Sequence, residues 1–316
     1  MATQGQKRQQ ADGAIPLRTR SLPQVHTVGI SDARLLPDET FAEAWSSIIL
    51  PEGEKDRIAQ SAAAGFVLRE RVTFERLPLH GVIMLVGPPG TGKTTLAHGL
   101  ADRVAQMLTS LGTFAFLEIN PHALASSSLG RSQQAVEQLF ATTIAETAYA
   151  GPLVVLIDEV ETIATDRRQL SFEANPADVH RAVDAALVGL DQVAREHRHV
   201  LFVVTSNFPE AIDDALTSRA DLIVPIGLPD LEARKAILSD VIKAVVEAFP
   251  EARHLLDGDL LNKAAEASDG LDGRRLRKVI AAAAGRSPES TVNPGRLTAV
   301  DVMTAIREAV MGGGEG

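Results

Sequence analysis

Five short runs of apolar, mostly branched residues are spaced along the middle of the chain, with longer segments of helical periodicity between them. The runs are Val82–Val86, Phe114–Ile119, Leu153–Ile157, Val200–Thr205 and Leu222–Ile226. Runs in which nearly every position is apolar are typical of strands buried on both faces, as in a parallel sheet covered by helices. The pattern therefore predicts an α/β fold whose five-stranded parallel sheet is flanked by helices.

Helical periodicity surrounds these strands and continues after them. Within the sheet region, helices are expected over residues 54–75, from the loop after the first strand to about 109, over 131–147 and over 179–196. After Pro229 the branched runs stop, and polar residues suited to helix N-caps precede four further helical segments. These residues are Asp230, Asp259, Asp272 and Thr298. We therefore expect an α/β core over 39–228 and a small all-helical domain over 229–311.

The two ends of the chain lack such periodicity. Residues 1–38 are polar and dotted with prolines, so a flexible N-terminal arm is expected, and capture of a partner by this arm stays open. The last five residues, 312–316, read GGGEG and are expected to form a disordered tail.

Composition excludes several classes of protein. The 31 basic and 41 acidic residues give a formal net charge of −10, which argues against a broad face that neutralises a nucleic-acid backbone. The absence of cysteine excludes disulfides, thiolate nucleophiles and cysteine-ligated zinc. No signal peptide and no apolar run of about twenty residues are present, so a cytoplasmic protein without a membrane partner is expected.

The loop after the first strand carries the strongest chemical signal. The segment GPPGTGKT fits the pattern GxxxxGK[ST] between a strand and a helix. Its backbone N–H groups can surround phosphate oxygens at a helix N-terminus, while Lys93 reaches the β- and γ-phosphates and the Thr94 hydroxyl ligates Mg²⁺. The predicted nucleotide-binding residues are Gly87, Pro88, Pro89, Gly90, Thr91, Gly92, Lys93, Thr94 and Thr95.

Polar residues at the ends of the third and fourth strands complete a candidate hydrolytic site. Asp158 is placed to hold Mg²⁺, and Glu159 is placed to polarise a water molecule as a general base. Asn207 can hydrogen-bond that water or the γ-phosphate. The alternatives are a solvated strand end for the acidic pair and a turn-forming role for the asparagine.

Two arginines are candidates for stabilising transition-state charge. Arg219 precedes the fifth strand and can act on the nucleotide of a neighbouring subunit; the alternative is a surface arginine paired with Asp221. Arg274 starts a helix of the all-helical domain, and its side chain is expected to point toward a phosphate. The basic residues beside it, Arg275, Arg277 and Lys278, are expected to face solvent or a subunit contact, although the cluster also fits a nucleic-acid patch.

The order of these motifs resembles that of the AAA+ ATPases over about residues 41–310. Shorter motifs look like the pachytene-checkpoint family, whose members remodel HORMA-domain proteins. These motifs are Ile119–Leu124, Leu156–Ile163, Asn175–Asp178, Arg181–Leu187, Ser218–Asp221 and Gly270–Lys278. The length of the chain is similar to that of bacterial members associated with HORMA proteins in cyclic-oligonucleotide anti-phage signalling.

The resemblance implies roles for individual residues. It implies a homohexamer that binds ATP and Mg²⁺ between subunits, with Arg219 as an arginine finger acting in trans, Asn207 as first sensor and Arg274 as second sensor from the helical lid. It also implies two substrate-gripping pore loops. Their candidate residues are Ser128, Leu129, Gly130 and Phe172.

Two departures from the family pattern bear on substrate handling. Ser128 and Leu129 stand where the family's first pore loop usually presents an aromatic residue with an apolar neighbour, and an aliphatic grip buries less area. This favours partial remodelling of a mobile segment. The residues before the core are too few for the folded adaptor-binding domain of eukaryotic members, so recognition without an adaptor, or through the arm, is expected.

The resulting hypothesis is an ATP-driven remodeller of a HORMA-domain partner that acts as a negative regulator of bacterial anti-phage signalling. The alternative from another class is a nucleotide-gated, DNA-associated assembly factor, although direct nucleic-acid binding is disfavoured by the charge. A feeder subunit of a compartmental protease is a third alternative, without a recognisable docking motif.

Overall fold

The computed structural model describes residues 21–24, 27–124, 131–162 and 176–312. The α/β core is built on one six-stranded sheet with the order β1-β3-β4-β5-β2-β6. The strands are β1 (Ile30–Leu36), β2 (Val82–Val86), β3 (Phe114–Ile119), β4 (Leu153–Ile157), β5 (Val200–Ser206) and β6 (Leu222–Pro225). Strands β2 to β6 are parallel, which confirms the predicted five-stranded parallel sheet.

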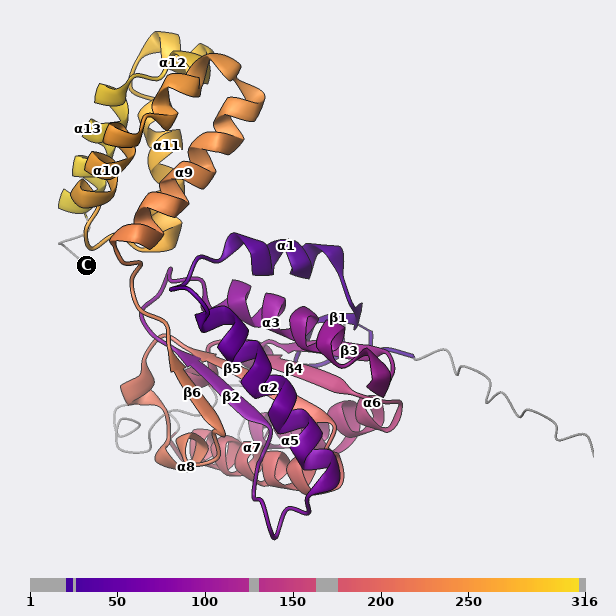
Figure 1. The fold of residues 1–316 in the computed structure, drawn as a ribbon. Helices are drawn as coiled ribbons and strands as arrows, with labels where there is room; N and C mark the ends of the chain where they lie inside the picture. Colours follow the sequence, from indigo (N-terminus) through magenta and orange to yellow (C-terminus); the bar gives the residue numbers. More distant parts are fainter. Residues whose placement is uncertain (1–20, 25–26, 125–130, 163–175, 313–316) are drawn as a thin grey trace, which may run out of the picture.

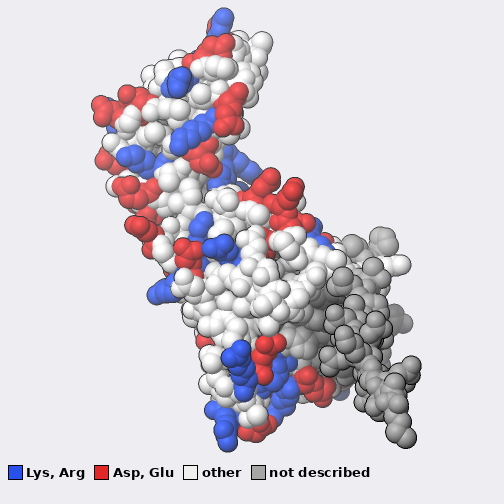
Figure 2. Space-filling model, turned by 45° about the vertical axis from the view of Figure 1, so that its right-hand side comes forward, with Lys and Arg blue, Asp and Glu red and all other residues white. Residues whose placement is uncertain are grey.

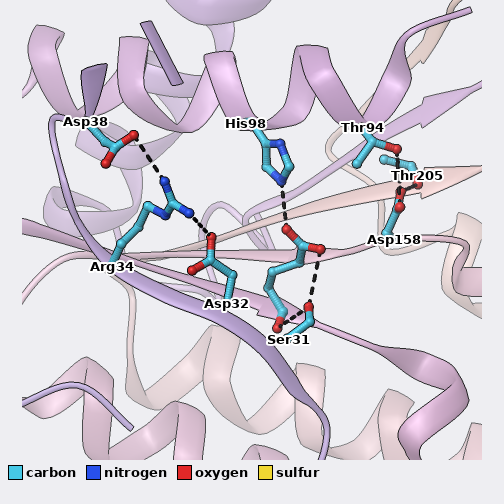
Figure 3. A network of polar contacts seen from close by, with 9 residues as sticks. Ser31, Asp32, Arg34, Asp38, Thr94, His98, Asp158 and Thr205 are labelled. Carbon is cyan, nitrogen blue, oxygen red and sulfur yellow. Dashed lines mark hydrogen bonds and ion pairs between the residues drawn. The ribbon is translucent and has the colours of Figure 1, made fainter. Parts of the chain in front are cut away.

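Strand β1 corrects the prediction of a flexible arm over residues 1–38. It runs antiparallel to β3 at the edge of the sheet, where Ala33 pairs with Leu117. Its two ends are anchored by Ile30 and Leu36, which are buried. Arg34 between them forms an ion pair of 2.5 Å with Asp32 (Figure 3). The remainder of the predicted arm lies largely outside the described residues.

Helices cover both faces of the sheet (Figure 1). One face carries α1 (Glu39–Ser47), α2 (Glu54–Arg71) and α3 (Lys93–Met107). The other carries α5 (Arg131–Gln138), α6 (Ala145–Tyr149) and α7 (Pro176–Glu196), while the short helices α4 (Pro121–Leu124) and α8 (Asp214–Thr217) follow β3 and precede β6. A π-helical segment, Leu139–Ile144, joins α5 to α6 within the single helix predicted over 131–147.

Strand β2 explains the layered arrangement. All five of its residues are buried. Ile83 and Leu85 belong to the hydrophobic cluster shared with α2 and α3, and Met84 belongs to the cluster shared with α5 and α7. Because successive side chains of a strand point to opposite faces, an unbroken apolar run supplies both halves of the core.

Four of the five α-helices that the structure describes after Pro229 share a hydrophobic core of their own, which includes Leu238, Leu276 and Ile306. We call residues 231–311 the lid. Its helices are α9 (Leu231–Ala248), α10 (Gly258–Ala267), α11 (Gly273–Ala284), α12 (Pro288–Val292) and α13 (Ala299–Met311).

Three of the four predicted helix caps of the lid are confirmed. The side chains of Asp230, Asp272 and Thr298 each accept a hydrogen bond from a backbone N–H in the first turn of the helix that follows. The prediction of Asp259 as a cap is wrong. Helix α10 is capped two residues earlier, by Asp257, whose carboxylate accepts from the N–H groups of Asp259 and Leu260.

The lid stands at one end of the core, above α1 in Figure 1. Arg277 of α11 donates a hydrogen bond of 2.6 Å to the carbonyl of Ser47, at the end of α1. The N–H of Arg274 donates to the carbonyl of Gly90 at 3.3 Å. Helix α11 thus contacts the core at two points, and Ile49 of the core packs against the hydrophobic cluster of the lid.

No helix in the described part of the chain combines the length and the apolar character needed to cross a bilayer. The predicted tail lies almost wholly outside the described residues, which end at Gly312.

Candidate active site

A cavity of about 560 Å³ lies at the carboxyl ends of the parallel strands, between the core and the lid. Its walls come from the glycine loop before α3, the ends of β4 and β5, the segment after α1, the link to the lid and the start of α11. The lining includes Ile48, Leu50, Gly90, Lys93, Thr94, Asp158, Glu159, Thr205, Asn207, Ile226, Leu228, Ile237 and Arg274. Ligands of open α/β sheets bind at this edge.

The glycine loop lies close to backbone at Gly87 and close to a side chain at Gly90. Gly87 has a φ of +153°, and a Cβ built on it would lie 2.0 Å from the carbonyl oxygen of Ile226. Gly90 has a φ of +81°, and a Cβ there would lie 2.5 Å from the carboxyl carbon of Asp272, the cap of α11. The loop therefore needs glycine both for its left-handed backbone and for its contact with the lid.

We expect Gly90→Ala to weaken binding of a non-hydrolysable ATP analogue by about 5- to 100-fold. The added Cβ strains a left-handed residue and displaces the Asp272 carboxylate, and strain of this kind costs about 1–3 kcal/mol. Isothermal titration calorimetry measures the change. The control is Gly285→Ala, because the Cβ of residue 285 would have no neighbour closer than 3.7 Å. Equal affinities of the two variants would contradict the strain argument.

Lys93, the first residue of α3, lies at the centre of the loop. Its ammonium group donates hydrogen bonds of 2.8 Å to the carbonyls of Gly87 and Pro88. Burial lowers the pKa of Lys93, while the carboxylates of Glu161, Asp158 and Glu159 act in the opposite direction. A buried ammonium group at the N-terminus of a helix, beside inward-facing N–H groups, suits the phosphates of a nucleotide.

Asp158 is oriented by two hydroxyl groups (Figure 3). The Thr94 hydroxyl donates to Oδ1 of Asp158 at 2.9 Å, and the Thr205 hydroxyl donates to the same oxygen. Thr205 was not among the site residues predicted from the sequence, although it stands in the Thr-Ser-Asn motif at the end of β5. A hydroxyl and a carboxylate are hard oxygen donors that fit Mg²⁺, which commonly takes its other ligands from phosphates and water.

Within the described part of the chain, no group of three or more histidine or acidic side chains could hold a metal ion by itself. The pair formed by Thr94 and Asp158 therefore fits a metal that arrives with phosphate oxygens, which complete its coordination shell.

Glu159 follows Asp158 in a strained backbone conformation. Its φ of +52° makes it the only non-glycine residue with a positive φ among the described residues. Its N–H donates to the Thr205 hydroxyl at 3.1 Å, and its carboxylate, which is half exposed, accepts from the side-chain amide of Asn207 at 3.2 Å. Strain of this kind clusters at functional sites, and here it turns a carboxylate toward the cavity.

Two further contacts surround Glu159 and Asn207. Nε2 of His122, in helix α4, lies 3.6 Å from Oε2 of Glu159. The N–H of Asn207 donates to the Glu161 carboxylate at 3.1 Å. The structure therefore brings together the predicted general base and the predicted first sensor. It adds His122, which the sequence analysis had named only as part of the motif Ile119–Leu124.

The two candidate arginines lie in different places. Arg274 lines the cavity from the first turn of α11. Arg219 does not line it. Its Nε and Nη2 atoms each donate a hydrogen bond of 2.7 Å to the carboxylate of Asp191 in α7. The alternative partner considered from the sequence, Asp221, instead accepts from the N–H groups of His80 and Gly81.

One wall of the cavity is apolar and was not predicted from the sequence. It is formed by Ile48, Leu50, Ile226, Leu228 and Ile237. Such a wall suits the flat face of a nucleotide base. The apolar triplet at residues 48–50 was its only signal in the sequence.

The basic residues beside Arg274 differ in their surroundings. Arg275 and Lys278 are exposed, as expected. Arg277 is half-buried and bonds to Asp240 within the lid and to Ser47 in the core, so it tethers the lid to the core within one chain. The candidate pore-loop residues lie outside the described residues. They are Ser128, Leu129, Gly130 and Phe172.

The chain is similar in sequence to several known proteins. The profile of the ATPase family associated with various cellular activities (AAA) matches residues 83–228. CD-NTase-associated protein 6 of Pseudomonas aeruginosa is 47% identical over 281 residues, covering 89% of this chain and 92% of the relative. The putative pachytene checkpoint protein 2 of Caenorhabditis elegans is 32% identical over 279 residues, covering 81% of this chain and 65% of the relative.

A solved structure shares the fold at lower identity. A chain of the E. coli MS115-1 HORMA:CdnC:Trip13 complex superposes with a TM-score of 0.71 at 17% identity, covering 91% of this chain and 97% of that chain. The chain described here spans less than two thirds of the C. elegans protein but almost all of the Pseudomonas protein.

Proposed function

The chain belongs to the AAA ATPase family that includes CD-NTase-associated protein 6 and the pachytene checkpoint proteins, and from this premise we propose that it remodels a HORMA-domain protein with energy from ATP hydrolysis. The geometric observation that carries the hydrolytic part is the Asp158–Glu159 pair facing Lys93, Thr94 and Asn207 across one cavity.

ATP occupies the cavity with its phosphates on the glycine loop and its base against the apolar wall. Lys93 exchanges its bonds to the loop carbonyls for bonds to phosphate oxygens. Thr94 and Asp158 would hold Mg²⁺, which, when bound, neutralises charge that develops on the phosphates.

Glu159 and Asn207 act on the attacking water. The Glu159 carboxylate accepts a proton from the water, and the Asn207 amide, 3.2 Å from that carboxylate, positions the water or the γ-phosphate. The Arg274 side chain approaches the phosphates from the lid. All of these groups come from one chain.

The working assembly is a homohexamer in which Arg219 reaches the nucleotide of the adjacent subunit. Arg219 supports this arrangement because it lies outside its own cavity. An arginine supplied in trans stabilises transition-state charge on the γ-phosphate, as it does in other nucleoside triphosphatases.

The HORMA-domain partner is supported by the relatives rather than by the geometry. The Pseudomonas relative carries the name CD-NTase-associated protein 6, and the E. coli structure that shares the fold is a HORMA:CdnC:Trip13 complex. We place the chain in the same setting, as a negative regulator of bacterial anti-phage signalling in the cytoplasm.

The DNA-associated alternative is disfavoured. On the face in Figure 2, Lys and Arg side chains are interspersed with Asp and Glu and form no continuous basic stripe. The net charge of −10 also disfavours binding to a nucleic-acid backbone.

We expect the Glu159→Gln protein with ATP to form a stable complex with the purified HORMA-domain protein of the same organism, because bound ATP is not consumed. Size-exclusion chromatography measures the complex, and Lys93→Ala, which should not bind ATP, is the control. No complex with either variant, together with several-fold, salt-sensitive stimulation of wild-type turnover by duplex DNA, would favour the alternative.

A further inference from the structure

Arg219 is held by a carboxylate that the hydrolytic site does not use. We propose that Asp191 is a positioning residue for Arg219, which it fixes in the orientation that meets the neighbouring subunit's γ-phosphate. The inference rests on the proposed function, because it takes Arg219 to be the arginine finger.

The contact between the two side chains has the geometry of a two-point clamp. Nε of Arg219 donates to Oδ1 of Asp191, and Nη2 donates to Oδ2, both at 2.7 Å. Parallel hydrogen bonds between a guanidinium and a carboxylate fix the plane of the arginine as well as its position. The hydrogen bonds from Arg219 hold the pKa of Asp191 below its usual range, so the carboxylate stays charged at neutral pH.

The clamp leaves part of the guanidinium available. An arginine carries five N–H donors. Two point to Asp191, and Nη1 supplies a third to the carbonyl of Ala215 at 2.7 Å. Two N–H groups are left on Nη1 and Nη2, and the side chain is 21% exposed. These two donors can serve phosphate oxygens while Asp191 occupies the Nε side of the guanidinium.

The backbone that carries Arg219 is also anchored. Arg219 lies in the short link between α8 and β6, and Asp221 in the same link accepts hydrogen bonds from the N–H groups of His80 at 2.9 Å and Gly81 at 2.6 Å. The His80 ring contributes a further contact, with Nε2 located 3.3 Å from Oδ1 of Asp191. The main chain around Arg219 is therefore held through Asp221, and the Arg219 side chain is held separately by Asp191 of α7.

Pre-ordering explains why such a clamp would raise turnover. A free arginine samples many rotamers, and those that miss the γ-phosphate contribute nothing to the transition state. Asp191 restricts Arg219 to one rotamer before the side chain contacts the nucleotide of the neighbouring subunit. Because Asp191 itself does not contact the nucleotide, its loss should lower kcat and leave the KM for ATP nearly unchanged.

We expect Asp191→Ala to reduce kcat by about ten- to one hundred-fold, the range of a small misplacement of a catalytic group, with KM within twofold of wild type. Phosphate release at saturating ATP measures kcat. Asp191→Glu should recover part of the loss, since it restores a carboxylate. Glu196→Ala removes an exposed carboxylate of the same helix that bonds to Gln192, and it should keep wild-type turnover.

Parallel variants separate this inference from the proposed function. Arg219→Ala measures the full contribution of the finger, and the double variant of Arg219 and Asp191 should lose no more than Arg219→Ala does. If Arg219→Ala is inactive while Asp191→Ala has wild-type kcat, the positioning role is wrong and the finger stands. If Arg219→Ala keeps wild-type turnover, the positioning role of Asp191 and the arginine-finger role of Arg219 are both wrong. A rise in kcat of Asp191→Ala would mean that Asp191 restrains Arg219, which also overturns the inference.

A purely structural role of Asp191 is tested by Asp191→Asn, which keeps the shape of the side chain. The amide can accept only one of the two hydrogen bonds and carries no charge. We expect its melting temperature and its oligomeric state to match those of wild type while kcat falls. A fall in kcat that appears only together with loss of assembly would contradict a positioning role.

Discussion

Replacing Glu159 with glutamine is expected to lower ATP turnover by about 10²–10⁴-fold, the usual contribution of a general base, while ATP binding stays within a few-fold of wild type. The amide keeps the size of the side chain but cannot take a proton from water. Asp158 and Thr94 are untouched, and their contact does not involve the Glu159 side chain. Phosphate release measures turnover, and titration with a fluorescent ATP analogue measures binding.

Two controls define the result for Glu159. Glu54→Gln changes another carboxylate that lines the same cavity, and it should keep turnover within about twofold because no contact links it to the site of attack. Asp158→Asn should weaken Mg²⁺-dependent binding as well as turnover. Wild-type turnover of Glu159→Gln would show that another group activates the water.

Removing the guanidinium of Arg219 with alanine is expected to lower turnover by about 10³-fold or more, as for arginine fingers in related chemistry. ATP affinity should change little, because the proposed action of Arg219 is on charge that develops in the transition state. The stability of the fold should also change by less than about 1 kcal/mol, since the partner Asp191 is one third exposed, at 33%, and can be hydrated.

Mixing two inactive proteins tests whether Arg219 acts in trans. Arg219→Ala subunits keep an intact glycine loop, and Lys93→Ala subunits keep an intact Arg219. Mixed rings therefore contain some subunit interfaces that combine an intact glycine loop with an intact Arg219. Partial turnover should return on mixing. Mixed assemblies that form but stay inactive would contradict action across a subunit boundary.

The sheet was predictable because buried parallel strands have an unambiguous signature. The strands β2, β3 and β4 have the predicted bounds, and those of β5 and β6 differ by one residue at one end. Strand β1 has no such signature: as an edge strand it buries only Ile30 and Leu36, and its middle carries Asp32 and Arg34. Helix α1, capped by Asp38, was likewise missed because only Phe41 on it is fully buried.

The polar half of the site was predictable for a different reason. Phosphate chemistry requires particular residue types at fixed spacing, and Lys93, Thr94, Asp158 and Asn207 satisfy it. The base wall was not predictable, since apolar residues such as Ile48 and Ile237 occur everywhere in a core. Thr205 and Asp191 act through other side chains, and contacts between distant segments leave no local pattern.

Helix α11 couples the lid mechanically to the glycine loop. Asp272 and Arg274, at its first turn, touch Gly90, so the loop that receives the phosphates is also the seat of the lid. Four of its α-helices, α9, α10, α11 and α13, share one hydrophobic core, so they would move together as a stiff lever. In Figure 1 the tip of that lever, α12, lies at the end remote from the seat. A shift of the glycine loop by a fraction of an ångström when phosphate leaves would thus become a larger displacement at α12. A small chemical event would in this way produce a large movement of the lid.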